Sequence, residues 1–314
     1  MFFFNFIYMK PVSIITVNFN QGYVTEAFLT SIDLTNNYSP VEIIVVDNGS
    51  KVNNVPEWTV KYPDIKFIRS EENLGFAGGN NIGIKEATGR YLFLVNNDTE
   101  FTPGLIETLV DKLESNPRIG IVSPKIRYFD RPDMLQYMGF TSMNYFTARN
   151  QCIGQFETDK GQYDQLTGPT GYAHGAAMMI RKECIEKGGL MAENFFLYYE
   201  EMDWCDHIKK AGYEIWLVTG ALIYHKESVS VGKASALKEY FMNRNRILFI
   251  RRNAPLHAKI IFYLYFFTIV VSRNVLKYVQ TGHTDFIKWL FRAIWWNISN
   301  SKNSKNLGYP IKKI

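Results

Sequence analysis

An apolar run in the first third of the chain stops abruptly in two asparagines and an aspartate. The stretch LFLVNNDTE, residues 92–100, places Asn96, Asn97 and Asp98 directly after that run. Carboxylate and carboxamide oxygens are hard ligands that suit Mg²⁺ or Mn²⁺, which one or two carboxylates commonly hold together with substrate phosphates. The stretch therefore predicts a metal site for a diphosphate. The same residues would also make a turn and a helix N-cap before residues 103–113, and their types alone do not decide between the two interpretations.

Other apolar segments of the first half also end in polar residues. Near-continuous apolar runs predict strands at residues 12–19, 41–50, 65–70 and 90–95, and helical spacing predicts helices at 23–32, 53–62 and 82–88. Residues 72–81, rich in Gly and Asn, are predicted as a loop. Strands that alternate with helices indicate an α/β fold with a mostly parallel sheet, whose ligands bind beyond the carboxyl ends of the strands. Binding residues are therefore expected at those ends, among them Asn18, Asn20, Asp47 and Asn73.

The residues after the first strand exclude two common nucleotide sites. The sequence there is VNFNQGY, whereas a Rossmann domain requires GxGxxG and a P-loop requires GxxxxGK[ST] at this point. The sheet is therefore expected to bind a nucleotide by another arrangement.

Composition bounds the cellular setting and the partners. Cys152, Cys184 and Cys205 form no CxxC pair, so a reducing cytoplasm fits better than a disulfide framework or a zinc ribbon. The net charge of +5 is mild, and basic residues gather near the C-terminus. This pattern favours an anionic membrane surface or anionic substrates over nucleic acid, for which there is no recognition motif. Residues 1–10 form an apolar N-terminal extension without the basic start or cleavage site of a signal peptide.

Seven motifs, in order, resemble those of the family 2 glycosyltransferases with the GT-A fold, especially the bacterial rhamnosyltransferase-like members. They lie within about residues 12–252 and read VNFN, VVDNGS, ENLGFAGGNNIGI, LVNND, GYAHGAAMMIRKE, FFLYYEEMDWCDHIKKAGYEIW and IYHKES. The resemblance implies a GT-A catalytic domain over residues 11–253, with a mostly parallel central sheet flanked by helices. Residues 254–314 would then form a C-terminal helical extension.

The resemblance also implies which residues bind the donor. By position, Asp47 would bind the nucleotide base, and a carboxylate can accept from the imide N–H of uracil or thymine. The glycine-rich segment would contact the nucleotide where Gly75 lets the backbone approach closely, with Asn73 and Asn80 beside it. The rest of the predicted donor set comprises Asn18, Asn20, Asn96, Asn97 and Arg244. Arg244 matches a recurring Arg-Asn pair of the family, and a solvated basic helix face is the competing interpretation.

The resemblance also implies which residues bind the metal and which one acts as the general base. NND stands where the family usually has DxD, so the resemblance implies Asp98 as the direct metal ligand, Asn96 as a weaker one and His225 as a third. The acidic helix start of residues 198–213 implies Glu201 as general base, a Glu where Asp is more usual, with Asp203 as a second candidate. Charge at a helix N-terminus is the competing interpretation of these acids. His174 is predicted either near the acceptor or as a backbone cap.

The C-terminal region combines aromatic segments with Arg and Lys, as interfacial amphipathic helices do. Its longest apolar stretch, residues 260–271, is shorter than the roughly 20 residues of a spanning helix. We therefore expect peripheral contact with the inner face of the cytoplasmic membrane, and a homodimer interface made by the same helices is the alternative.

The resemblance predicts a metal-assisted, inverting hexosyltransferase. It would move a sugar, with rhamnose the first choice, from a dTDP- or UDP-sugar to a growing surface-polysaccharide or polyprenyl-diphosphate-linked glycan, with Mg²⁺ or Mn²⁺ as cofactor. Two alternatives stay open at this point. One is a catalytically silent, nucleotide-binding subunit, and the other is a nucleotidyltransferase that makes sugar nucleotides.

Overall fold

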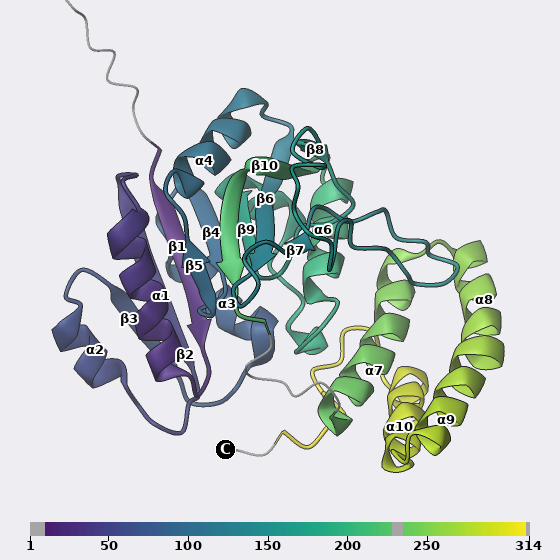
Figure 1. Cartoon of the computed structure of the whole chain (residues 1–314). Coiled ribbons are helices and arrows are strands. Elements are labelled where there is room, and N and C mark those ends of the chain that lie inside the picture. Colours follow the sequence, from purple (N-terminus) through teal and green to yellow (C-terminus); the bar gives the residue numbers. More distant parts are fainter. Residues whose placement is uncertain (1–9, 228–234, 312–314) are drawn as a thin grey trace, which may run out of the picture.

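A mixed, ten-stranded sheet forms the centre of the molecule (Figure 1). The structure is a computed structural model that describes residues 10–227 and 235–311, so the N-terminal extension lies outside the described residues except for Lys10. The strand order is β3-β2-β1-β4-β9-β6-β10-β5, with β7 paired to β6 and β8 to β10. The strands are β1 (Val12–Asn18), β2 (Val41–Asn48), β3 (Lys66–Ser70), β4 (Tyr91–Val95), β5 (Thr99–Phe101), β6 (Ile119–Tyr128), β7 (Leu135–Tyr137), β8 (Gly168–Pro169), β9 (Ala177–Arg181) and β10 (Glu214–His225).

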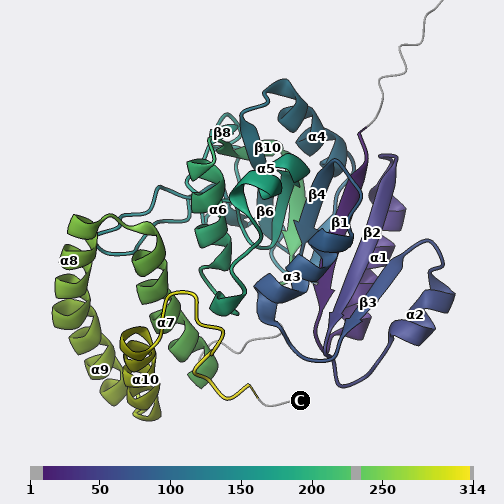
Figure 2. The same cartoon turned by 180° about the vertical axis from the view of Figure 1, so that it is seen from behind.

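Helices cover both faces of this sheet. One hydrophobic core lies between the sheet and α1, α2 and α4, and a second lies under α3, α5 and α6 and continues into the C-terminal helices. Figure 2 shows α3, α5 and α6 on the face that is hidden in Figure 1. The helices are α1 (Gly22–Thr35), α2 (Val55–Lys61), α3 (Gly75–Glu86), α4 (Leu105–Ser115), α5 (Lys182–Gly188), α6 (Glu200–Lys210), α7 (Ala236–Asn253), α8 (Leu256–Tyr265), α9 (Val271–Gln280) and α10 (Asp285–Ser299).

The predicted parallel half of the sheet is confirmed. Strands β3, β2, β1 and β4 pair in parallel, and the register sets Asn18 beside Asp47. The second half of the sheet adds antiparallel pairs that the apolar runs did not show: β9 lies between β4 and β6 and runs antiparallel to both. The polar ends of β1 and β2 therefore meet at one edge, as the pattern predicted.

The prediction of a loop over residues 72–81 is wrong, because α3 already begins at Gly75. Its glycines permit close packing of this helix against β1. A β-carbon at Gly83 would lie 2.4 Å from Ile15 Cγ2, and one at Gly79 would lie 2.8 Å from Val17 Cγ1. Glycine lowers helix propensity, but here the absent side chain lets the helix approach the sheet closely.

The helix-cap interpretation of NND is also wrong. Asn97 and Asp98 form a turn, but β5 follows it, and the residue that caps α4 is Gly104. The turn leads into β5, which pairs with β10 so that Thr99 lies opposite His225. Two residues that are 127 positions apart in the sequence, Asp98 and His225, are thereby brought to the same edge of the sheet.

The C-terminal helices stand away from the sheet on α7 (Figure 1). Residues 266–270 are π-helical and join α8 to α9, which makes one continuous helix of 25 residues, Leu256–Gln280. An 18-residue stretch of this helix has a mean hydropathy of 1.5. The apolar stretch is therefore part of a longer helix than predicted. By length and composition alone this helix is sufficient to cross a membrane.

Candidate active site

A hydrogen-bonded network of polar side chains lies at the carboxyl edge of the sheet. Asn18 donates from Nδ2 to Asp47 Oδ1 at 2.9 Å and to Ser50 Oγ at 3.1 Å, and its Oδ1 accepts from Thr25 Oγ1 at 3.0 Å. Asn97 joins the network by donating to Thr25 Oγ1 at 2.9 Å. These side chains are buried. Buried polar groups that satisfy one another fix their own orientations, so this network holds Asp47 and the NND turn in a defined arrangement.

Asp47 is almost fully buried, and Arg69 at the end of β3 pairs with its Oδ2. Arg69 also donates to the backbone oxygen of Ser50 at 2.8 Å. The sequence patterns did not identify Arg69, although its place near the end of a predicted strand was a usable signal. Asp47 lies outside the lining of both cavities described below, so its contact with a nucleotide base stays a prediction.

The segment before α3 is tied to the end of β2 by Asn48. Asn48 Oδ1 accepts from the Leu74 backbone at 3.0 Å, and Asn48 Nδ2 donates to Asn73 Oδ1 at 3.2 Å and to the Gly75 backbone oxygen at 3.0 Å. Gly75 has φ +71°, and a β-carbon there would lie 2.2 Å from the Phe196 oxygen. The position therefore requires glycine.

Two other residues that were predicted to bind the sugar nucleotide, Asn20 and Asn80, make hydrogen bonds to the backbone of the protein. Asn20 accepts from the Lys51 backbone at 2.8 Å, so its carboxamide holds the turn after β2. Asn80 donates to the Phe76 backbone oxygen, one turn earlier in its own helix, at 2.9 Å. Asn80 is buried, so the structure places it within α3 packing and gives no support to a nucleotide contact.

Asp98 and His225 form a pair that fits a divalent cation. His225 Nδ1 lies 2.8 Å from Gln136 Oε1, which can only accept, so Nδ1 carries a proton and Nε2 faces Asp98. Nε2 lies 3.1 Å from Asp98 Oδ1, a buried oxygen that has no hydrogen-bond donor among the described residues. The two atoms at this separation require a shared proton or metal ion, and an imidazole held from behind by a carboxamide is a typical metal ligand.

The rest of a metal coordination shell would have to come from a substrate. In the described ranges 10–227 and 235–311, no cluster of three or more His, Cys, Asp or Glu side chains could hold a metal ion. Asn96 is partly exposed and faces the same cavity as Asp98. The residues present therefore fit a two-ligand site that is completed by the phosphate oxygens of a donor.

A cavity of about 470 Å³ opens beside this pair. Its polar wall is made by side chains of the sheet edge, and its apolar wall comes from the ends of β1 and η1 (Glu193–Phe195), from α7 and from the last described residues. The polar wall contains Asn48, Asn73, Asn96, Asn97 and Asp98, and the apolar wall contains Phe19, Phe196, Leu237, Tyr309, Pro310 and Ile311. Sequence analysis did not predict that the end of the chain would line the site.

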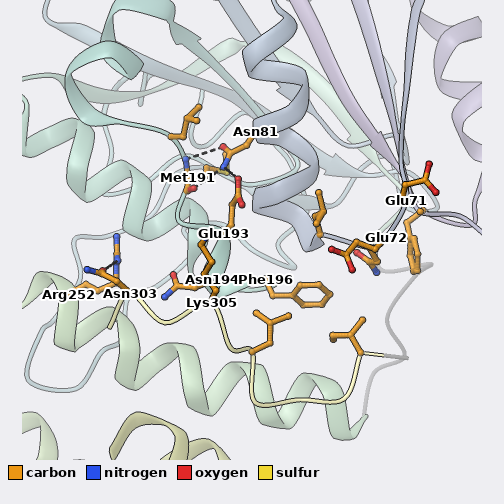
Figure 3. Close-up of a pocket in the computed structure, with 17 residues that line it drawn as sticks. Glu71, Glu72, Asn81, Met191, Glu193, Asn194, Phe196, Arg252, Asn303 and Lys305 are labelled. Carbon is orange, nitrogen blue, oxygen red and sulfur yellow. Dashed lines mark hydrogen bonds between the residues drawn. The ribbon is translucent and has the colours of Figure 1, made fainter. Parts of the chain in front are cut away.

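A larger cavity of about 640 Å³ adjoins the first and shares Phe19, Asn73, Phe196 and Ile311 with it. Figure 3 shows three glutamates that line it, Glu71, Glu72 and Glu193, and the Glu193 carboxylate accepts from Asn81. Like charges repel, so these carboxylates disfavour a diphosphate there. The smaller cavity, beside Asp98, is the better diphosphate site.

The acidic start of α6 supplies the candidate base. A β-carbon built on Gly175 would lie 3.8 Å from both Glu201 Cγ and Phe76 Cζ, and Phe76 lines the smaller cavity. Burial raises the pKa of Glu201 above its usual value. Glu200 is more deeply buried, and its Oε2 lacks a hydrogen-bond partner among the described residues. Burial, together with the charge of Glu201, raises the pKa of Glu200 well above the usual value.

Asp203, the second candidate base, has a structural position. Its carboxylate accepts from Arg252 Nε at 2.8 Å, from Arg252 Nη2 at 3.1 Å and from Asn253 Nδ2 at 2.7 Å. The side chain is fully buried. Both of its oxygens are already bonded to Arg252 and the side chain is closed off from solvent, so Asp203 joins α6 to the end of α7 and does not fit the role of base.

His174 caps the backbone, which was one of the two roles predicted for it. Its Nδ1 accepts from the Ala176 backbone at 3.1 Å. Burial lowers the pKa of His174 to about 3, so the ring is neutral. The ring lies 6.2 Å from that of His225 between centroids. Residues 174–176 thus lie between the candidate metal pair and Glu201.

Arg244 and Asn245 hold the acidic motif from behind. Arg244 is fully buried and donates to the backbone oxygens of Asn194, Phe195 and Leu307, and Asn245 donates to those of Phe195, Leu197 and Tyr198. The predicted solvated face is therefore wrong for Arg244, which also lies outside the lining of both cavities. The pair positions the segment before α6 and, through Leu307, the C-terminal wall of the site.

Comparison with known proteins identifies the class. The profile of a family described as Glycosyl transferase family 2 matches residues 13–189, which is more than half of the chain. The chain therefore belongs to this family and is a glycosyltransferase.

Relatives and solved structures agree with that assignment. The chain is 25% identical over 244 residues to an N-acetylglucosaminyl-diphospho-decaprenol L-rhamnosyltransferase of Mycobacterium tuberculosis. That alignment covers 71% of this chain and 78% of the relative. A mannosyltransferase of Pyrobaculum calidifontis, solved with GDP-Man and Mn²⁺, superimposes on this chain with a TM-score of 0.55 at 15% identity. The superposition covers 93% of this chain and 88% of the mannosyltransferase chain. GalNAc-T7, solved with UDP, GalNAc and Mn²⁺, has a TM-score of 0.60 at 14% identity and covers 83% of this chain, which spans 57% of the GalNAc-T7 chain. The fold is therefore GT-A, as predicted.

Proposed function

We propose that the protein is an inverting glycosyltransferase that transfers a sugar from a pyrimidine nucleoside diphosphate to a lipid-linked glycan, with Mg²⁺ or Mn²⁺. The observation that carries the proposal is the Asp98–His225 pair, 3.1 Å apart at the edge of a cavity of about 470 Å³. Rhamnose is the first choice of sugar and a polyprenyl-diphosphate-linked glycan the first choice of acceptor. Both choices are supported by the name of the mycobacterial relative.

The donor would bind along the polar wall of this cavity. Asp47, oriented by Asn18 and Arg69, would accept from the imide N–H of uracil or thymine. The diphosphate would lie near Asp98, away from the carboxylates of the larger cavity. A bound Mg²⁺ or Mn²⁺, held by Asp98 and His225, would stabilise the charge that develops on the leaving diphosphate.

Glu201 would take the acceptor proton. The acceptor hydroxyl attacks the anomeric carbon from the face opposite the diphosphate, so a new C–O bond forms as the bond to the phosphate oxygen breaks. Glu201 accepts the hydroxyl proton during this attack, and the configuration at the anomeric carbon is inverted. Its raised pKa makes Glu201 a stronger base than an ordinary glutamate.

A donor panel tests the proposal. Purified protein with dTDP-rhamnose or common UDP-sugars, Mn²⁺ and a membrane lipid extract should release nucleoside diphosphate, and EDTA should stop the release. Glu201→Gln should lower the rate by about 10²–10⁴-fold, the usual contribution of a general base. The matched control is Glu100→Gln, because Glu100 lies on β5, pairs with Lys226 at 2.8 Å and is assigned no chemistry.

The outcomes separate the parts of the proposal. Release with one donor identifies that donor. Release that persists in EDTA contradicts the metal site. Release that survives Glu201→Gln contradicts the assigned base, and tight donor binding without release in any extract contradicts the proposed acceptor.

A further inference from the structure

The outer side of the α8–α9 helix carries a dense set of exposed apolar side chains. We call these residues the outer apolar face, and their side chains are 46–74% exposed. They are Leu256, Ile260, Ile261, Leu264, Phe267, Ile269, Leu276 and Val279. Figure 1 shows this helix at the edge of the molecule, far from the strands. Soluble proteins rarely expose so many large apolar side chains on one helix, and such a surface marks an interaction site.

The charge of the same region indicates what that site contacts. Of the chain's 35 basic and 30 acidic residues, nine basic and one acidic follow residue 253, and residues 254–284 contain no Asp or Glu. The helix itself carries Lys259, Arg273 and Lys277. Apolar side chains combined with basic ones, without acids, match a surface that is apolar inside and negatively charged outside.

We propose that the outer apolar face binds the surface of an anionic phospholipid membrane, with the helix axis parallel to the plane of the bilayer. The helix is about 37 Å long at 1.5 Å per residue, so its length alone does not exclude a spanning orientation. Its packing decides between the two.

The inner side of the helix lies along α7 and is attached to it by polar contacts. Tyr278 donates to Glu239, and Asn274 donates to Asn243 Oδ1 at 3.3 Å; both acceptors are on α7. Phe262, Phe266 and Val270 are fully buried in the core that also contains residues of α7. A spanning orientation would require this helix to leave α7 and break these contacts. An in-plane orientation keeps them and exposes only the outer side to lipid.

Helix α10 adds aromatic residues suited to the lipid headgroup level. Trp295 is 65% exposed and Phe291 53% exposed, with Lys288 and Arg292 exposed on the same helix. Tryptophan is enriched at the membrane–water interface because its ring is apolar and its N–H is polar. The inference goes beyond the proposed function, since it holds whichever sugar and acceptor the enzyme uses.

Vesicle sedimentation with the full-length protein tests the proposal. Wild type should sediment with vesicles of phosphatidylcholine and phosphatidylglycerol at 3:1, less with phosphatidylcholine alone, and less at high salt. Ile260→Asp/Leu264→Asp should weaken binding to the anionic vesicles by about tenfold or more, since charge replaces lipid-facing apolar area. The control is Leu34→Asp/Val60→Asp, because these side chains are 77% and 84% exposed and lie on α1 and α2, away from the C-terminal helices.

Each remaining outcome overturns the proposal or one part of it. Failure of wild type to bind anionic vesicles, or equal loss in the control variant, overturns the lipid face. A wild-type dimer that becomes monomeric in Ile260→Asp/Leu264→Asp, without vesicle binding by either protein, identifies a second copy of the chain as the occupant. Protein that resists alkaline carbonate extraction from cell membranes contradicts the in-plane orientation, whereas its release supports it. Donor binding in solution serves as a separate readout, so failure here is distinguishable from failure of the proposed function.

Discussion

The catalytic part of the chain and its C-terminal helices use polar and apolar residues in opposite ways. At the carboxyl edge of the sheet, Asn18, Asp47 and Asn97 are buried; Asn18 donates to Asp47, and Thr25 links Asn97 to Asn18. On α8 and α9, large apolar side chains are exposed. Residues 1–253 carry 26 basic and 29 acidic residues, and the remainder carries nine and one. The difference suits a polar ligand at the edge of the sheet and, for the C-terminal helices, the anionic membrane surface proposed above.

The largest effect is expected from a substitution that disrupts the polar site and leaves the C-terminal helices unchanged. Asp98→Asn removes the charge of the candidate metal pair, so metal-dependent release should fall by about 10³-fold, equivalent to several kcal/mol of transition-state stabilisation. Calorimetric titration of Mn²⁺ in the presence of donor should show the loss of metal binding, while vesicle binding stays at the wild-type level. Unchanged metal affinity would contradict the assignment of Asp98.

Gln136 offers a finer test of the same pair. Gln136→Leu keeps the size of the side chain but removes the acceptor that holds His225 Nδ1–H at 2.8 Å. Partners behind a metal-binding histidine typically contribute 10–100-fold to affinity, so Mn²⁺ binding should weaken by about that factor. Gln136→Glu, which restores an acceptor oxygen, should recover part of it. Equal weakening in both variants would indicate a packing effect.

The pH dependence of turnover should report on Glu201. Its pKa is raised by burial, and a base acts only when it is deprotonated. The rate should therefore rise about tenfold per pH unit below that pKa and level off above it, at a pH higher than an ordinary glutamate near 4.3 would give. Donor affinity measured over the same range separates the chemical step from binding. A flat rate down to pH 5 would contradict the prediction.

Arg244 connects the catalytic region to the C-terminal segment, so its replacement tests whether the stability of one region depends on the other. Its buried guanidinium donates to backbone oxygens on both sides, at Asn194 and at Leu307. Arg244→Lys cannot make these contacts together and should destabilise the protein by about 3 kcal/mol. Chemical denaturation would measure this loss, and limited proteolysis should show faster cleavage after residue 300. Arg292→Lys, on an exposed arginine, is the control and should leave both unchanged.

The smallest expected effect concerns Glu200. Because the folded protein raises the pKa of this carboxyl group, folding favours its protonated form, and stability falls as pH rises from the usual glutamate value to the raised one. Glu200→Gln should therefore raise the melting temperature by about 2 °C or more at pH 8, and the gain should shrink toward pH 5. A difference that is constant with pH would exclude this cause.

The sequence predicted the features that depend on local patterns. Apolar runs identified β1, β2 and β4, and the acidic residues of 200–203 were found at the start of α6 as expected. Gly75 and Gly79 misled the interpretation because their role is set by neighbours in space, here Phe196 and Val17. Helix propensity alone cannot distinguish a glycine in a loop from a glycine within a helix that lets the helix pack closely against the sheet.

The parts of the site that could not be predicted depend on long-range contacts. Gln136 is 89 residues from His225 in the sequence, and no local pattern marks it as its partner. Arg244 was predicted to bind the donor, with a solvated basic face as the alternative, yet the C-terminal segment covers it and accepts its hydrogen bond through Leu307. Asp203 and Glu201 differ by two positions on one helix, so only the position of Arg252 shows which carboxylate is already paired.

The wall that Tyr309, Pro310 and Ile311 contribute to the cavity bears on how such enzymes diversify. Tyr309 packs on Tyr240 and Phe241 of α7 and on Trp289 of α10, so this wall is supported by helices and not by the strands that carry the candidate site. Replacing only these last described residues would reshape one side of the substrate cleft and leave Asp98, His225 and Glu201 in place. Ligand preference could thus change through this segment while the residues at the edge of the sheet stay the same.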